Sequence, residues 1–243
     1  LGSQATNPEI SAVDWANNKD EGFAKMDVFS PQEYSFPDAK DYFKQALADK
    51  SRDNPAYGNA WRAVGETMHL VADMSLAPHV RNDGHGLGDG DPVEVSTTDA
   101  SIGEFSSTNW TTSINYDQSV TGLIHDLAAY TNRNFFSKDT IPIAGKTTTA
   151  NGQPVYPNPD ISKLTVNKAG YLVSTIDGQT VRLARQSAWY RWGLSKNPGY
   201  TIDAAAITDQ QRILTPTIVR ATEAVIERFL PRFEVQATVK PDP

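Results

Sequence analysis

Three of the four histidines lie close together in the sequence, and an acidic residue accompanies them. His69, His79 and His85 fall between positions 69 and 85, whereas His125 stands apart. Asp73 follows His69 by four residues, so on an α-helix the two side chains project from one face, one turn apart. Such a pair can hold one divalent cation. Imidazole and carboxylate ligands without thiolate favour zinc over manganese or iron, and they are typical of catalytic sites.

Further candidate ligands follow on the same segment. One turn earlier on the same helix face, Gly65 leaves room for a metal or a second helix to approach. Pro78 is expected to end the helix, and the turned chain then brings His79 back towards the same side. The predicted metal ligands are His69, Asp73, His79, His85 and Glu94.

Each of these residues also has an ordinary structural explanation. A histidine and an aspartate four residues apart on a helix often form only a solvated hydrogen bond. His85 lies in a stretch typical of an exposed loop, and Glu94 sits where the dipole of a new helix stabilises a carboxylate. The aspartates of this loop are Asp83, Asp89 and Asp91. They are expected to form turns, with a calcium loop as an alternative, although the EF-hand order of ligands is absent. His125 is expected to be structural or exposed.

The composition excludes several other kinds of site. The 243 residues include no Cys, which removes disulfides, Cys-ligated zinc, iron–sulfur clusters and cysteine nucleophiles. A net charge of −7 argues against non-specific nucleic-acid binding through a basic face. No stretch approaches the roughly 18 consecutive apolar residues of a membrane span, and Leu1 does not open a signal sequence. We therefore expect no transmembrane segment, and a soluble chain or the mature part of one.

Helical periodicity dominates the elements that must position these residues. The predicted helices cover 35–50, 54–78, 117–136 and 208–233, with further helical patterning at 189–194 and a possible helix start at Pro92. Asp177-Gly178 predicts a tight hairpin turn between strands at 171–176 and 179–184. Residues 81–92 are predicted to form a loop.

These elements predict a mainly α, multi-helical fold with a small β-hairpin insertion. The expected organisation is an irregular leader (1–34), a helical metal-site region (35–142), a loop and hairpin insertion (143–184), C-terminal helices of the same domain (185–236) and a tail (237–243).

The segment from Ala63 to His79 carries the motif His-x3-Asp-x5-His, with a Gly before the first His and the ending Asp-Met-Ser-x-x-Pro-His. It resembles the metal-site helix of the zinc-dependent phospholipase C family, which is related to the single-strand-specific zinc nucleases. Weaker similarity continues through 88–94, 130–137 and the last long helix. The resemblance covers roughly residues 36–142 and 186–233, and it is closer to secreted bacterial members than to the well-known toxins.

This resemblance implies an all-helical domain with a zinc cluster that hydrolyses phosphodiesters. His69 is then a ligand of one metal, Asp73 the bridging, catalytic carboxylate, and His79 a ligand of another metal. The family completes that metal with a His-x3-Glu pair, whereas the candidates here, His85 and Glu94, lie nine positions apart. One to three zinc ions are expected.

The family also takes ligands from sequence upstream of this helix, whereas this chain has no His before His69. We expect that an N-terminal segment, removed or supplied by a second chain, completes the site; the alternative is a reduced site of one or two metals. The resemblance further implies a secreted or periplasmic protein.

Two functions are predicted from these observations. In the first, metal-activated water attacks the phosphorus of a phospholipid or another phosphodiester, with nucleic acid possible only as a substrate. Trp110, Tyr190 and Trp192 offer stacking surfaces to a substrate, or belong to the core. In the second, the protein is a non-catalytic zinc-binding structural or assembly protein with an incomplete metal cluster, and its hairpin offers an edge for pairing.

Overall fold

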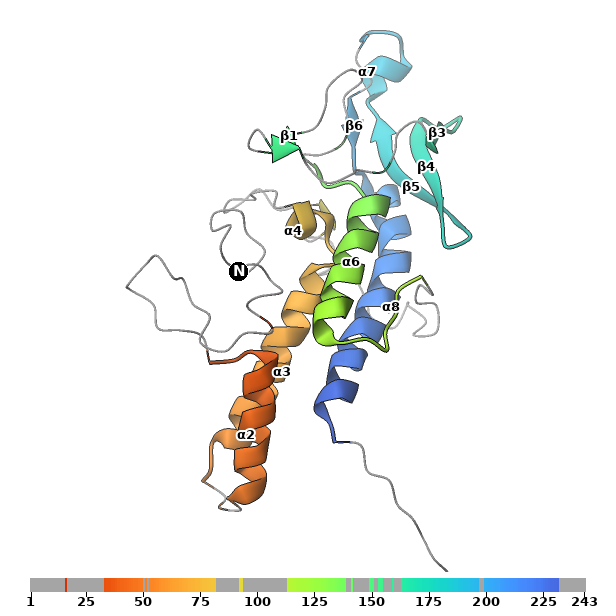
Figure 1. The fold of residues 1–243 in the computed structure, drawn as a ribbon. Coiled ribbons are helices and arrows are strands. Elements are labelled where there is room, and N and C mark those ends of the chain that lie inside the picture. The colour runs from red at the N-terminus through yellow and green to blue at the C-terminus, as the bar shows by residue number, and fades with distance from the viewer. Residues whose placement is uncertain are drawn as a thin grey trace, which may run out of the picture.

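A computed structural model of the chain describes residues 16, 33–49, 51, 53–81, 92–93, 113–138, 141, 149–150, 153–154, 159, 163–196 and 199–231. This part of the chain is mainly helical, with a small antiparallel sheet at one end (Figure 1). The longer helices are α2 (Phe36–Ala48), α3 (Ala56–Asp73), α6 (Val120–Asn134) and α8 (Ala204–Phe229), and the short ones are α4 (Ala77–Arg81) and α7 (Ala188–Arg191). The sheet has the order β3 (Thr165–Val166), β4 (Tyr171–Ile176), β5 (Gln179–Gln186), β6 (Tyr200–Thr201), and β1 (Thr149–Ala150) pairs with β2 (Gln153–Pro154).

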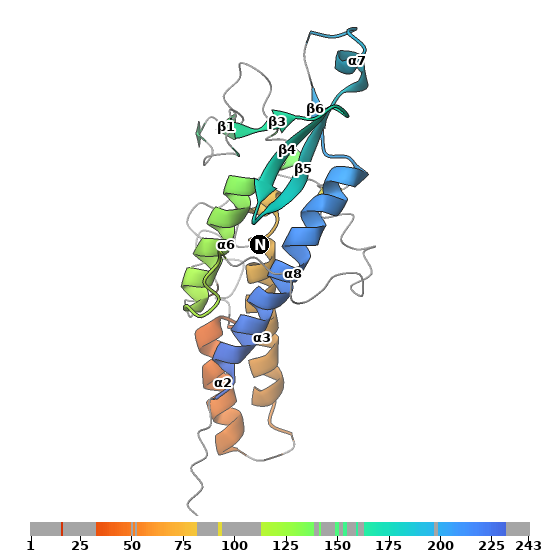
Figure 2. The same ribbon diagram turned by 90° about the vertical axis from the view of Figure 1, so that its right-hand side faces the viewer.

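The first described helix begins where the sequence predicts. The hydroxyl of Ser35 accepts a hydrogen bond from the Asp38 backbone N–H, and the Asp38 carboxylate accepts one from the Ser35 backbone N–H at 2.9 Å. This reciprocal capping box and Pro37 in the first turn fix the start of α2. Helix α2 packs against α3, which also packs against α8 (Figure 2).

The sheet shares one core with the helices. Side chains of β4 and β5 join the same cluster of buried apolar residues as α2, α3, α6 and α8; these are Leu172, Ile176, Val181, Leu183 and Ala184. Arg182 of β5 donates two hydrogen bonds from its guanidinium to the Asp209 carboxylate, at 2.7 and 2.9 Å, and a third from its backbone N–H at 3.0 Å. Asp209 is buried, so this contact fastens the hairpin to the first turns of α8.

The predicted hairpin turn is confirmed. Asp177 and Gly178 both have positive φ, 48° and 78°, as a two-residue turn that matches the twist of the strands requires. The Asp177 carboxylate accepts a hydrogen bond from the Tyr130 hydroxyl at 2.8 Å, which ties the turn to α6. Strand β5 runs to Gln186, two residues beyond the predicted end.

Some predicted boundaries are wrong. The second helix ends at Asp73, not at Pro78, and Pro78 instead lies in the first turn of α4, where its missing N–H removes no helical hydrogen bond. The last long helix was predicted to begin at position 208, but α8 begins at Ala204. The Asp203 side chain caps it there and accepts a hydrogen bond from the Ala206 N–H at 3.1 Å.

Two other helices are shorter than the periodicity predicts. Residues 189–194 form only the end of the four-residue α7 and the turn after it, and α6 begins at Val120, after its cap Ser119. No helix in the described ranges is long and apolar enough to cross a membrane.

Asp209→Asn should lower the free energy of unfolding by about 2 kcal/mol or more, because it removes the charge from a buried, multiply hydrogen-bonded ion pair. Urea unfolding at neutral pH measures this loss. The control is Asp41→Asn, whose exposed partner Lys44 lies 3.2 Å away and whose loss should cost about 0–1 kcal/mol. Equal losses in the two variants would contradict the assignment.

Acid should destabilise the fold through the same aspartates. Burial acts to raise the pKa of Asp203 and Asp209, but hydrogen bonds from Tyr171 and Ala206 to the first, and from Arg182 to the second, leave both pKa values below 3.8. A carboxyl group whose pKa is lower in the folded state stabilises that state above its unfolded pKa. The free energy of unfolding should therefore fall as the pH drops below about 4. Denaturant titrations between pH 6 and 2 should show a shallower fall in Asp209→Asn.

Candidate metal centre

The carboxylate of Asp73 is the most constrained group among the predicted ligands. Asp73 is the last residue of α3, and its side chain is only 8% exposed. Its Oδ2 atom is buried and accepts no hydrogen bond from any described residue. A buried acceptor without a donor costs about 1–3 kcal/mol, and more when it is charged. A cation, or a hydrogen-bond donor outside the described residues, would offset this cost.

Two imidazoles face this same oxygen. The Nε2 atom of His69, one turn earlier on α3, lies 3.5 Å from Asp73 Oδ2, and the Nδ1 atom of His79 on α4 lies 4.0 Å from it. Zinc binds imidazole nitrogen and carboxylate oxygen at about 2.0–2.2 Å in a tetrahedral arrangement, so the separation of the His69–Asp73 pair is compatible with a shared ion, whereas that of the His79–Asp73 pair is wider than a tetrahedral ion requires. The three side chains thus lie close together, as the spacing predicts, and their role as metal ligands stays a prediction.

The break between α3 and α4 brings His79 back to Asp73. The backbone N–H groups of Ser75 and Leu76 donate hydrogen bonds to the carbonyls three residues earlier, at 2.9 and 3.0 Å, which tightens the end of α3. The chain then enters α4, which packs against α6. The turn thus precedes Pro78, although its consequence for His79 is the predicted one.

The two histidines differ in their access to solvent. The side chain of His69 is 67% exposed, whereas that of His79 is 10% exposed. Gly65, one turn before His69, is exposed, and a Cβ atom there would meet nothing within 4 Å, so the predicted open space is present. His69 is therefore the solvent-exposed histidine beside Asp73, and His79 is the nearly buried one.

The other two predicted ligands cannot be placed relative to Asp73. His85 and Glu94 lie outside those residues, as do Asp83, Asp89 and Asp91. Within the described ranges, no group of three or more His, Asp or Glu side chains could hold a metal ion. The assignment of His69, Asp73 and His79 as metal ligands therefore stays a prediction. His125 is exposed on α6, as predicted.

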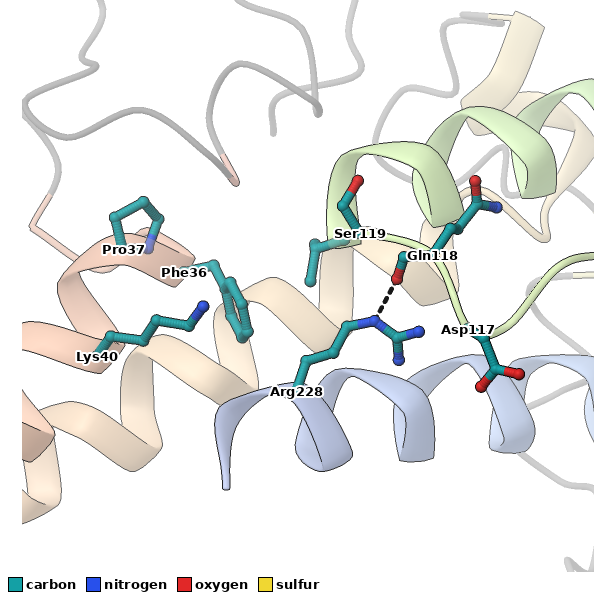
Figure 3. Close-up of a pocket in the computed structure, with 8 residues that line it drawn as sticks. Phe36, Pro37, Lys40, Asp117, Gln118, Ser119 and Arg228 are labelled. Carbon is teal, nitrogen blue, oxygen red and sulfur yellow. Dashed lines mark hydrogen bonds between the residues drawn. The ribbon is translucent and has the colours of Figure 1, made fainter. Parts of the chain in front are cut away.

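A cleft of about 590 Å³ lies elsewhere, between the starts of α2 and α6 and the end of α8 (Figure 3). It is lined by Phe36, Pro37, Lys40, Asp117, Gln118, Ser119, Val120 and Arg228. The Arg228 guanidinium donates hydrogen bonds to the backbone carbonyls of Gln118, Tyr116 and Ala224. Its donors thus connect α8 to the start of α6. No predicted metal ligand lines this cleft, and no sequence motif indicates it.

A comparison of the chain with protein-family models, curated proteins and solved structures finds no match. The resemblance to the zinc-dependent phospholipase C family therefore rests on the motif in α3 and α4 and stays a prediction.

Asp73→Asn should separate a metal-binding role from a folding role. With a chelator present, the variant should be at least as thermally stable as the wild type, because it removes a buried carboxylate that lacks a hydrogen-bond donor. Zinc at about 100 times its dissociation constant should stabilise the wild type by about 2.7 kcal/mol but leave the variant unchanged.

Thermal unfolding with chelator and with zinc measures both effects. The control, Asp126→Asn on the exposed face of α6, should respond like the wild type. A large loss of stability in chelated Asp73→Asn would show instead that the carboxylate serves the fold.

Proposed function

We propose that this protein is a metal-dependent phosphodiester hydrolase of the phospholipase C type, with His69, Asp73 and His79 among its zinc ligands. The observation that carries the proposal is the buried Asp73 Oδ2 atom, which lacks a hydrogen-bond donor among the described residues and faces two imidazole nitrogens. The same proposal includes a zinc phospholipase C-like domain, one to three zinc ions and a secreted or periplasmic location.

Each of the three residues has a distinct part in this proposal. Asp73 supplies a carboxylate fixed at the end of α3, which lowers the reorganisation needed to hold a cation. His79 holds the metal from the nearly buried side of Asp73, and the exposed His69 holds it from the solvent side. Zinc, when bound, supplies Lewis acidity that lowers the pKa of water and neutralises charge developing on phosphoryl oxygens. His85 and Glu94 are our candidates for completing the donor set.

The substrate that fits this proposal best is a phospholipid. The chain carries a net charge of −7, which disfavours the approach of a long polyanion such as a nucleic acid. A single phosphodiester in a lipid headgroup meets less of this repulsion. Nucleic acid remains relevant only as an alternative substrate.

Metal content and turnover in His69→Ala test the proposal, with His125→Ala as the matched control because both histidines are exposed on helices. The full chain is stripped with chelator, reloaded with zinc and assayed with a chromogenic phosphodiester. His69→Ala should lose bound zinc and about 100-fold or more of the activity, since a ligand of the metal is removed. His125→Ala should retain both.

Equal zinc content and equal activity in the two variants would overturn the site. One tightly bound zinc without turnover in the wild type would favour the alternative, a zinc site that only stabilises the protein.

A further inference from the structure

An exposed apolar cluster stands at the end of the molecule where the sheet lies. We call it the aromatic tip; it consists of Trp189, Tyr190, Trp192 and Leu194. Trp189, Trp192 and Leu194 are 63%, 69% and 66% exposed. Both ribbon views place α7 at the end of the molecule opposite the α2–α3 connection (Figures 1 and 2). Large apolar side chains gathered on a surface in this way indicate a binding site.

The aromatic tip is held in place by the backbone around it. Ser187 caps α7, and its N–H donates a hydrogen bond to the Gly199 carbonyl at 2.7 Å. The Arg191 guanidinium donates one to the Ala169 carbonyl at 3.1 Å, which fastens α7 to the turn before β4. Gly193, with φ of 74°, ends the helical turn. The rings thus project from a fixed support, and ordering them on binding costs little entropy.

The region that carries the tip is positively charged, although the chain is acidic. Residues 163–196 contain six cationic side chains and one carboxylate, Asp177, so their net charge is 6 − 1 = +5 against −7 for the whole chain. The cations are Lys163, Lys168, Arg182, Arg185, Arg191 and Lys196. Arg182 and Arg185 pair with Asp209 and Asp203 at the start of α8, so the net charge is 5 − 2 = +3 when these two aspartates are counted. Lys168, Arg191 and Lys196 are exposed on the tip or on the turn that it contacts. An anionic partner complements this charge.

We propose that the aromatic tip docks into the surface of an anionic phospholipid bilayer. Trp and Tyr rings favour the depth of the lipid headgroups, where an apolar body and a polar edge are both accommodated. Leu194 adds aliphatic surface for the acyl boundary, and the lysines and arginine attract anionic headgroups. This inference does not depend on the Asp73 centre, although a lipid surface is where a phospholipid substrate would be met.

Other occupants fit these observations less well. A second copy joined by two-fold symmetry would place the same positive surface against itself. A nucleic acid needs flat platforms for successive bases, but the rings of Trp189 and Trp192 stand at 68° to each other with centroids 6.3 Å apart. Leu194 offers no stacking face.

Vesicle flotation of the full chain tests the proposal. The wild type should bind vesicles of phosphatidylcholine mixed equally with phosphatidylglycerol, and bind pure phosphatidylcholine weakly, with the difference reduced by salt. Trp189→Ala combined with Trp192→Ala should lose about tenfold or more of the binding. The control is Leu47→Ala combined with Tyr57→Ala, which removes two exposed apolar side chains, 62% and 56% exposed, at the opposite end. It should bind like the wild type.

The proposal is overturned if the wild type does not bind the anionic vesicles, or if the tip variant binds them as well as the control does. It is also overturned if the tip variant loses self-association or binding of a single-stranded oligonucleotide while vesicle binding is unchanged. Circular dichroism confirms that each variant is folded. Asp73→Asn should retain vesicle binding, so a failure of the hydrolase proposal is distinguished from a failure of this one.

Discussion

A buried carboxylate oxygen that receives no hydrogen bond from the described residues is the constraint on which the account of this molecule depends. Removing a charged oxygen from water is unfavourable unless a cation or donors replace the lost hydration. Asp73 Oδ2 is in that situation, with the nitrogens of His69 and His79 as its nearest ionisable neighbours on α3 and α4. This oxygen and the two imidazole nitrogens beside it are the observation from which we propose a divalent metal site.

The rest of the fold keeps the end of α3 in place. Helix α3 packs against both α2 and α8, and α4 packs against α6. Helix α8 is fastened in turn to the hairpin by the Arg182–Asp209 pair, and α6 to the hairpin turn by Tyr130 and Asp177. The sheet is therefore a structural partner of the bundle, and it also supports α7 at the far end of the molecule.

The elements that were predicted correctly are those whose conformation is set by neighbouring residues in the sequence. The start of the first helix near Ser35 and the hairpin turn at Asp177-Gly178 depend only on neighbouring residues, and both were predicted. The end of α3 was not, because Pro78 is compatible with the first turn of a helix as well as with the end of one. The convergence of His69 and Asp73 followed from helical spacing. Other features depend on tertiary packing, which a local sequence pattern does not reveal. These are the burial of Asp73, the ion pair between Arg182 and Asp209, and the exposure of Trp189 and Trp192.

An anomalous-scattering map at the zinc absorption edge, from crystals of the full chain soaked in zinc, shows whether Asp73 holds a metal ion. We expect a peak about 2.0–2.2 Å from Asp73 Oδ2, with an imidazole nitrogen of His69 or His79 at a similar distance. A map with no peak beside Asp73 at saturating zinc, or with peaks only at other residues, would contradict it.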